Sequence, residues 1–378
     1  MRPWLRRIGT ALLFLTIALC LAPSLIPPFL DRIYHEGPPT GHFDGQRFFN
    51  PGPAATTSHG GPARFLNRWV TGDNERARWP SSVPVRPSVP PRQVHGEDML
   101  VTWIGHATVL VQSAGLNILT DPVWSRTVSP LPPIGPDRVR QPGVRFEDLP
   151  KIDVVLVSHN HYDHLDLPTL KRLWERDRPL IVTSLGNDRI LSAEGIESKA
   201  LDWGHAIGAA SGAEVEVVRN HHWSSRWGSD RNRALWSAFV VRLPGGNLFF
   251  AGDTGWGDGG WVDEAATRGP FRLAIIPIGA YEPRDVMKAN HVDPDEAVAM
   301  FEGLDPAMAV GVHWGTFQLT FEGIDEPRRR LEEARRRRGI APGRFIATEA
   351  GASFRVPTSA QPPPMQKAQS LLPSGSRK

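Results

Sequence analysis

Short apolar runs, many of them β-branched and alternating with polar residues, dominate the chain from Met99 onward and predict β-strands. The first strands are expected over MLVTWIG (99–105), TVLVQSA (108–114), LNILTDP (116–122) and IDVVLVS (152–158). The later ones are expected over LIVTSL (180–185), VEVVRN (215–220), WSAFVVRL (236–243), NLFFAGD (247–253), LAIIPIG (273–279) and MAVGVHWG (308–315).

Helical spacing appears between these strands. Helices are expected over LDLPTLKRLWERD (165–177), GNDRILSAEG (186–195), DPDEAVAMFEGL (293–304) and EPRRRLEEARRRRG (326–339). Strands and helices therefore alternate loosely through one unit with two strand-rich halves. This pattern favours an α/β fold for residues 99–357.

The flanking regions have a different character. Residues 31–98 are rich in Pro, Gly and Arg without a sustained period, and we expect an irregular segment that wraps the domain. Residues 358–378 are expected to form a disordered tail. At the N-terminus (1–30), Arg2, Arg6 and Arg7 precede an uncharged stretch from Ile8 to Leu30, which is typical of a secretory signal or a membrane anchor. An uncleaved anchor is favoured, with the globular part outside the cytoplasm, in the periplasm or at the cell surface.

The composition limits which partners and which metal ligands can be expected. The 378 residues carry a formal net charge of only +3, which gives no reason to expect nucleic acid as a partner. Cys20 is the single cysteine, so the chain can form no intrachain disulfide and no thiolate metal site. Any metal must be held by His, Asp or Glu.

The stretch SHNHYDHLD at 158–166 directly follows a predicted strand. His159 and His161 are two residues apart, which in extended backbone points both rings the same way, whereas Asp163 and His164 follow as the chain turns into a helix. One loop can thus serve two adjacent metal positions. A polar turn whose histidines bond to backbone is the alternative.

Later strand ends offer partners of the same chemical type. NHHW supplies His221 and His222, AGDTG supplies Asp253 between Gly252 and Gly255, and GVHWG supplies His313. A Gly-Asp-Thr-Gly turn alone is usually structural. In series with three histidine-bearing strand ends, it favours a metal site instead.

This order of motifs resembles the metallo-β-lactamase superfamily over roughly residues 99–355. The resemblance implies an αβ/βα four-layer sandwich with two mixed β-sheets and a dinuclear zinc site at the sheet edge. It also implies His159, His161 and His222 on one Zn²⁺ ion, Asp163, His164 and His313 on the other, and Asp253 bridging both. His222 is preferred to His221 because it directly precedes Trp223.

Four further stretches narrow the resemblance: TWIGHATVLVQ, LTDPVWSRTVSPLPPIGPDRVR, IGAYEPRDVMKANHVDPDEAV and GVHWGTF. Together they are similar to N-acylphosphatidylethanolamine-hydrolysing phospholipase D and its bacterial relatives. The family reaction releases N-acylethanolamine and phosphatidate, with a metal-bound hydroxide as the nucleophile. The implied partners are a phospholipid substrate and a membrane surface.

The resemblance also suggests roles around the metal site. His291 matches an active-site histidine that binds phosphate or assists the leaving group; it would otherwise only cap the turn at Asp293. Asp121 resembles a carboxylate that orients a ligand imidazole. Tyr281, Glu282 and Arg284 are expected in the pocket wall, while His106 is left outside the site.

Two alternatives stay open at this point. One is a metallohydrolase of a soluble ester, lactone or nucleotide phosphodiester, without the preference for lipid. The other is a non-catalytic envelope protein whose metal is only structural. His and carboxylate ligands also accept other divalent transition metals, so the sequence does not fix zinc.

Overall fold

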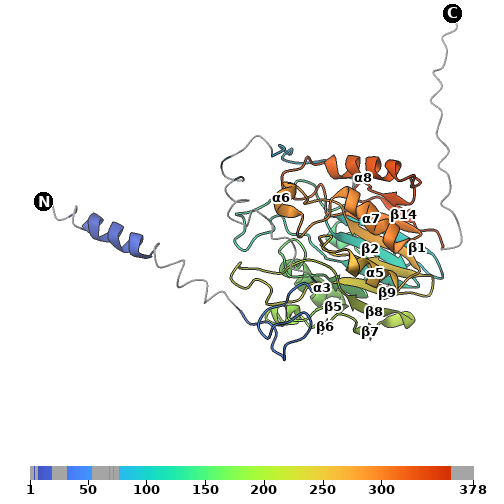
Figure 1. Cartoon of the computed structure of the whole chain (residues 1–378), viewed down its shortest axis with the longest axis horizontal. Helices are drawn as coiled ribbons and strands as arrows, with labels where there is room; N and C mark the ends of the chain where they lie inside the picture. The colour runs from blue at the N-terminus through green and yellow to red at the C-terminus, as the bar shows by residue number, and fades with distance from the viewer. Residues whose placement is uncertain are drawn as a thin grey trace, which may run out of the picture.

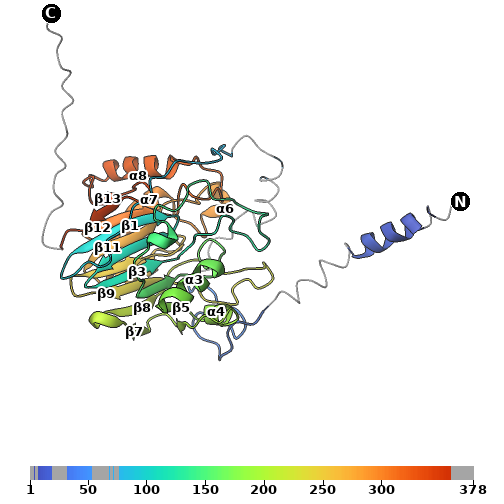
Figure 2. The same ribbon diagram turned by 180° about the vertical axis from the view of Figure 1, so that it is seen from behind.

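A computed structural model describes residues 4, 7–18, 32–52, 68, 71 and 76–358. Two seven-stranded β-sheets form its centre (Figures 1 and 2). The first sheet has the order β14 (Ser353–Arg355), β1 (Met99–Gly105), β2 (Thr108–Ser113), β3 (Leu116–Thr120), β4 (Val154–Val157), β5 (Leu180–Ser184) and β6 (Lys199–Leu201). The second has the order β13 (Phe345–Ile346), β12 (Met308–Val312), β11 (Phe271–Pro277), β10 (Asn247–Phe250), β9 (Ala238–Arg242), β8 (Glu214–Val218) and β7 (Ala206–Gly208).

Both sheets are mixed, and they mirror each other in construction. Strands β14, β1, β2 and β3 pair antiparallel, and β3 to β6 pair parallel. In the second sheet, β7 to β10 pair antiparallel and β10 to β13 pair parallel. Each half thus combines hairpin-connected strands with crossover-connected ones.

Helices cover the outer faces of the two sheets. They are α3 (Leu167–Asp177), α4 (Asn187–Ser192), α5 (Gly260–Ala266), α6 (Arg284–Met287), α7 (Pro294–Leu304) and α8 (Glu326–Arg337), with 3₁₀ turns η1 (Phe146–Asp148) and η2 (Ala210–Gly212). Helices α3 and α4 lie on the side of the first sheet, whereas α7 and α8 lie on the side of the second (Figures 1 and 2). The predicted αβ/βα sandwich is confirmed.

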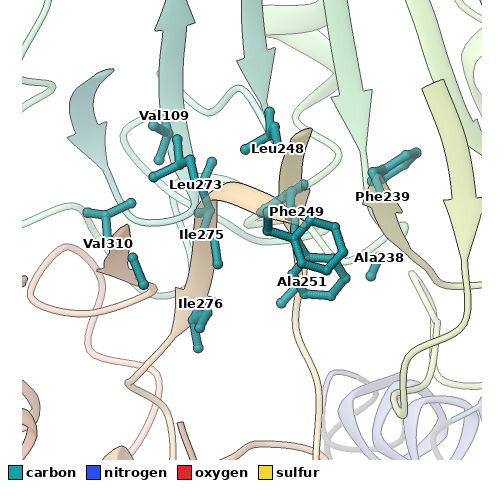
Figure 3. Packing of buried hydrophobic residues seen from close by; sticks show 14 of the residues in the cluster. Val109, Ala238, Phe239, Leu248, Phe249, Ala251, Leu273, Ile275, Ile276 and Val310 are labelled. Carbon is teal, nitrogen blue, oxygen red and sulfur yellow. The ribbon is translucent and has the colours of Figure 1, made fainter. Parts of the chain in front are cut away.

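Alternation along the strands explains the layers. In β4, Val154 and Leu156 belong to the core between the sheets, while Val155 and Val157 pack toward the α3 residues Leu170 and Leu173. Successive side chains of a strand point to opposite faces, so a strand buried on both sides reads as a continuous apolar run. Figure 3 shows the inter-sheet core, where Val109 of the first sheet lies near Leu273 and Leu248 of the second.

The carboxyl ends of alternate strands meet at one edge. Because antiparallel neighbours reverse direction, β1 and β3 run the same way as β4, and β8 runs the same way as β10 and β12. The loops after these strands carry the polar side chains singled out in the sequence. Gly252 permits a close approach there: with φ +60, a Cβ on it would lie 2.8 Å from Cβ of Ser158 at the end of β4.

All ten expected strands and all four expected helices are present, with ends shifted by a few residues. Six short elements were not predicted, namely β6, β7, β13, β14, α5 and α6. The short strands lie at the sheet edges, where a few residues do not build a recognisable period.

The described parts of the 31–98 segment lie against the sandwich. The hydroxyl of Tyr34 donates to Asp230, and the indole N–H of Trp79 donates to the carbonyl of Glu322. The predicted disordered tail falls, apart from Thr358, outside the described residues. So does most of the apolar N-terminal stretch, of which residues 7–18 are helical and exposed. Within the described part of the chain, no helix combines the length and the apolar character needed to cross a membrane.

Candidate metal centre

The loop after β4 and the loop after β8 bring three histidines together. The ligating nitrogens of His159, His161 and His222 all lie within 4.8 Å of one another. Nε2 of His159 is 2.8 Å from Nδ1 of His161. His222 is oriented from behind, because its Nδ1 donates to the carbonyl of Asn290 at 2.9 Å and leaves Nε2 turned to the cluster. This is the set predicted for the first metal position.

A second cluster combines the α3 side of the same loop with the end of β12. Asp163, His164 and His313 lie within mutual reach, together with His106 from the end of β1. Oδ2 of Asp163 is 3.4 Å from Nε2 of both His164 and His313. The second predicted set is thus also assembled, with one histidine more than predicted.

Asp253 lies between the two clusters. Its Oδ2 is 3.1 Å from Nε2 of His164, 3.0 Å from Nε2 of His313 and 4.0 Å from Nε2 of His222. One carboxylate oxygen thus faces histidines of both sets. This placement agrees with the bridging role that the resemblance implies for Asp253.

Asp121, directly after β3, is a buried carboxylate that holds metal-site side chains in place. Asp121 is fully buried with φ +30, and its Oδ2 accepts from Nδ1 of His164 at 2.6 Å. Its Oδ1 accepts from the backbone N–H of Ser158 at 2.7 Å, and its Oδ2 also accepts from the Ser158 hydroxyl at 2.6 Å. That hydroxyl oxygen is 2.9 Å from Nδ1 of His159. Asp121 therefore connects one histidine of each cluster.

The histidines of the centre fall into two groups according to the direction in which their pKa is shifted. Burial lowers the pKa of His161 to about 3 and holds the pKa of His159 and His222 well below the ordinary value. These rings stay neutral, which is the form that binds metal.

His164 and His313 differ because carboxylates surround them. Burial disfavours the charged ring, yet Asp253 and the neighbouring Asp163 outweigh it, raising the pKa of His164 well above its ordinary value and the pKa of His313 to about 9. In return, although burial opposes it, nearby histidines lower the pKa of both carboxyls well below the usual range.

Unpaired polar atoms at the centre show that the side chains fit a metal. Among the described residues, several buried atoms here have no hydrogen-bond partner: Nε2 of His161, His164, His222 and His313, and Oδ1 of Asp253. Buried polar atoms in proteins are nearly always paired, so a group of orphans that converge is exceptional. Imidazole nitrogens and carboxylate oxygens together form a donor set suited to divalent transition metals.

His291 adjoins the centre from the loop before α7. Its ring is buried, with Nδ1 3.9 Å from Oδ2 of Asp253 and without a partner. The cap of α7 is Asp293, whose carboxylate accepts from the N–H of Glu296. His291 therefore does not cap this helix, and its unpaired Nδ1 lies beside Asp253 of the centre.

The AYEPR residues Tyr281, Glu282 and Arg284 are held by hydrogen bonds near the centre. Tyr281 is fully buried and donates its hydroxyl to Glu326 at 2.9 Å, so its polar group is already paired, and its place in the pocket wall stays a prediction. Glu282 accepts from the N–H of Arg284, and Arg284 donates to the carbonyl of His291 at 2.6 Å. Arg284 supports the loop that carries His291, a role that the motif alone could not reveal.

Two further histidines need placing. His221 is buried but belongs to none of the clusters, which agrees with the preference for His222. His106, left outside the site in the sequence analysis, has Nε2 2.8 Å from Oδ2 of Asp163. The feature that could have indicated this contact is the position of His106 directly after β1, a strand that runs parallel to β3 and β4.

Comparison with known proteins fits this geometry. Residues 116–314 match the family described as Beta-lactamase superfamily domain. Among solved structures, an isothiocyanate hydrolase from Delia radicum gut bacteria superposes with a TM-score of 0.55 at 18% identity, covering 68% of this chain and 99% of its own. CmlA, a diiron β-hydroxylase from Streptomyces venezuelae, gives a TM-score of 0.53 at 21% identity, covering 70% of this chain and 54% of its own. At these identities the likeness shows the fold alone.

The chain is therefore a metal-dependent hydrolase of the metallo-β-lactamase superfamily. Within it, the chain belongs to the family of N-acyl-phosphatidylethanolamine-hydrolyzing phospholipase D: it is 35% identical to phospholipase D 1 of that name from Caenorhabditis elegans over 77% of this chain and 86% of the relative. The mitochondrial enzyme of that name from Saccharomyces cerevisiae is 34% identical over 61% of this chain and 50% of its own length.

Proposed function

We propose that the protein is a zinc-dependent phosphodiesterase that cleaves N-acylphosphatidylethanolamine into N-acylethanolamine and phosphatidate. The observation that carries the proposal is Asp253, whose Oδ2 faces His164, His313 and His222 of both clusters. A carboxylate in this position suits a pair of cations rather than one. His159, His161 and His222 would hold one Zn²⁺ ion, and Asp163, His164 and His313 the other.

Bound zinc supplies a water nucleophile at neutral pH and offsets the negative charge of the phosphoryl oxygens. The protein contributes position and proton handling. Because burial lowers the pKa of His291 to about 4, its ring is neutral at physiological pH, and it can donate or accept a hydrogen bond at a phosphoryl or leaving-group oxygen. Asp163 and Asp253 remain ionised, and their negative charges offset the positive charge at the centre.

A pocket of about 470 Å³, lined in part by the metal-site loop though by none of the metal-site side chains, supports a substrate larger than a simple ester. Its wall contains Tyr162, from the metal-site loop, and Arg226, four residues after His222. Arg226 lies over the Tyr162 ring at 3.8 Å and donates to the carbonyls of Asn160 and Leu165. A wall with aromatic, apolar and charged side chains suits a substrate with both apolar and polar parts.

Contact with a lipid surface is part of the proposal. Pro132 lines the same pocket, and on the turn around it the side chains of Leu131 and Ile134 are 63% and 74% exposed. Trp227, next to Arg226, is also exposed. Exposed apolar side chains beside a pocket favour entry of substrate from a bilayer. We further propose that the apolar N-terminal segment anchors the protein, with the hydrolase domain outside the cytoplasm.

The test is hydrolysis of N-acylphosphatidylethanolamine in mixed micelles by the purified full chain, followed by mass spectrometric detection of N-acylethanolamine. We expect release that a chelator abolishes and Zn²⁺ restores. Asp253→Asn should abolish it, whereas Asp258→Asn, a nearby exposed carboxylate outside both clusters, should not. Metal-dependent cleavage of soluble phosphodiesters or lactones, with none of the lipid, would overturn the substrate assignment.

A further inference from the structure

We propose that His106 is a positioning residue of the second metal position, donating its Nε2–H to Asp163 and thereby fixing the orientation of that carboxylate. The two atoms are 2.8 Å apart. This inference rests on the proposed metal centre, but not on the identity of the substrate.

The ring of His106 is held on several sides. Its relative exposure is 1%, its centroid is 4.0 Å from that of the His313 ring, and Phe317 packs edge-on at 5.3 Å. A buried ring between two such neighbours has little freedom to turn. Its hydrogen bond to Asp163 is therefore built into the fold and does not depend on a flexible side chain.

The backbone of His106 is equally constrained. Its φ of +54 is uncommon for a residue other than glycine. Its N–H donates to the Thr316 hydroxyl at 2.9 Å, and its carbonyl accepts from the N–H of His313 at 3.0 Å and from the Trp103 indole at 2.9 Å. His106 thus joins the end of β1 to the loop after β12, so one residue sets both Asp163 and His313. Non-glycine residues in this conformation concentrate at functional sites.

The tautomer distinguishes positioning from direct ligation. Among the described residues, Nδ1 of His106 is buried without a partner. If Nε2 bound a metal directly, the proton would lie on Nδ1 as a buried N–H without an acceptor, which is costly. If Nε2 donates to Asp163, Nδ1 is only an unused lone pair. The geometry therefore favours donation to the carboxylate.

The test is Zn²⁺ binding by the chelator-stripped full chain, measured by competition with a chromophoric chelator and without any lipid. In His106→Asn the side chain is too short to reach Asp163, and asparagine tolerates a positive φ. We expect the second Zn²⁺ ion to bind on the order of 10–100-fold more weakly, as is usual when the partner of a ligand is lost. The first ion should bind as in the wild type.

His106→Gln separates the two roles, because a glutamine amide can donate at similar reach but is a poor zinc ligand. We expect it to restore most of the lost affinity. His221→Gln, a buried histidine outside the clusters, is the matched control and should bind both ions normally. Circular dichroism of the metal-free variants verifies folding.

Unchanged zinc affinity in the folded His106→Asn variant would overturn the proposal. So would a glutamine variant as weak as the asparagine variant, since that result indicates direct ligation. Should the asparagine variant fail to fold, the glutamine variant still decides, because near-normal binding supports donation and loss of the second ion contradicts it. Absence of activity on N-acylphosphatidylethanolamine would leave these binding results intact, so the two proposals fail separately.

Discussion

Nδ1 of His164 lies 2.6 Å from Oδ2 of Asp121, and both side chains are completely buried. The pair joins the end of β3 to the loop after β4, so the sheet itself fixes the direction in which His164 presents Nε2. A carboxylate behind a ligand imidazole sets its tautomer and raises its basicity. The metal position thus depends on residues that need not touch the metal.

Asp121→Asn should weaken zinc binding on the order of 10–100-fold, because the amide can present its N–H₂ group to His164 or Ser158 and break the network. Isothermal titration of chelator-stripped protein with Zn²⁺ measures this. Asp148→Asn alters a partly exposed carboxylate paired with Arg145, outside both clusters, and serves as the control. Equal affinities for the two variants would contradict the role of Asp121.

Replacing His222 or its neighbour His221 by alanine should have unequal effects on the metal content. His222→Ala removes a nitrogen from the first cluster, and we expect the purified protein to hold about one metal ion less per chain than the wild type. His221→Ala should retain the wild-type content, because that ring belongs to neither cluster. Elemental analysis by plasma mass spectrometry measures both, and a reversed order would refute the assignment of His222.

Metal-free protein should lose stability as the pH falls from about 6.5 to about 4. Burial lowers the pKa of His291 to about 4, while the same ring in the unfolded chain titrates near 6.5. Between these values the unfolded state binds more protons, so stability decreases as the pH falls. His291→Gln should therefore show a shallower fall in melting temperature over this range. Parallel curves for variant and wild type would show that His291 does not cause the loss of stability at low pH.

Gly252→Ala should destabilise the protein by roughly 1–3 kcal/mol, because φ is +60 and the new Cβ would lie 2.8 Å from Cβ of Ser158 and 2.9 Å from the carbonyl oxygen of Ser237. Urea denaturation measures the change. Gly208→Ala, at the edge strand β7 with no atom within 4 Å of the new Cβ, should stay within about 0.5 kcal/mol of the wild type. Similar losses in both variants would argue against a specific close approach at Gly252.

Arg284→Ala should lower kcat while leaving the zinc content unchanged. The guanidinium donates to the carbonyl of His291 and pairs with Glu296, so its loss frees the loop that places the His291 ring. We expect roughly a 10-fold to 100-fold decrease, comparable to misplacing a catalytic group. Arg145→Ala, an exposed arginine paired with Asp148, is the control. A loss of bound zinc in Arg284→Ala would indicate a structural effect instead.

Strand positions could be predicted because the core imposes its periodicity on the sequence. Runs such as VVLV at 154–157 are buried on both faces, and polar residues begin abruptly where each strand leaves the sheet. The edge strands and short helices could not be predicted, since two to seven residues carry too little pattern. The partner of Tyr281 could not be predicted for a related reason: its hydroxyl pairs with Glu326, forty-five residues away in sequence, and no local pattern indicates such a partner.

The sequence by itself determined the donor chemistry: a chain without usable thiols places histidines and aspartates directly after buried strands, and only carboxylate and imidazole ligation is open to it. Tertiary structure decided which of these side chains converge. His221 and His222 are neighbours, and only one faces the cluster, because adjacent residues of extended chain point opposite ways and the packing of the two sheets selects the face. The strand order of the first sheet brings His106, which directly follows β1, to Asp163, and no pattern along the sequence indicates that contact.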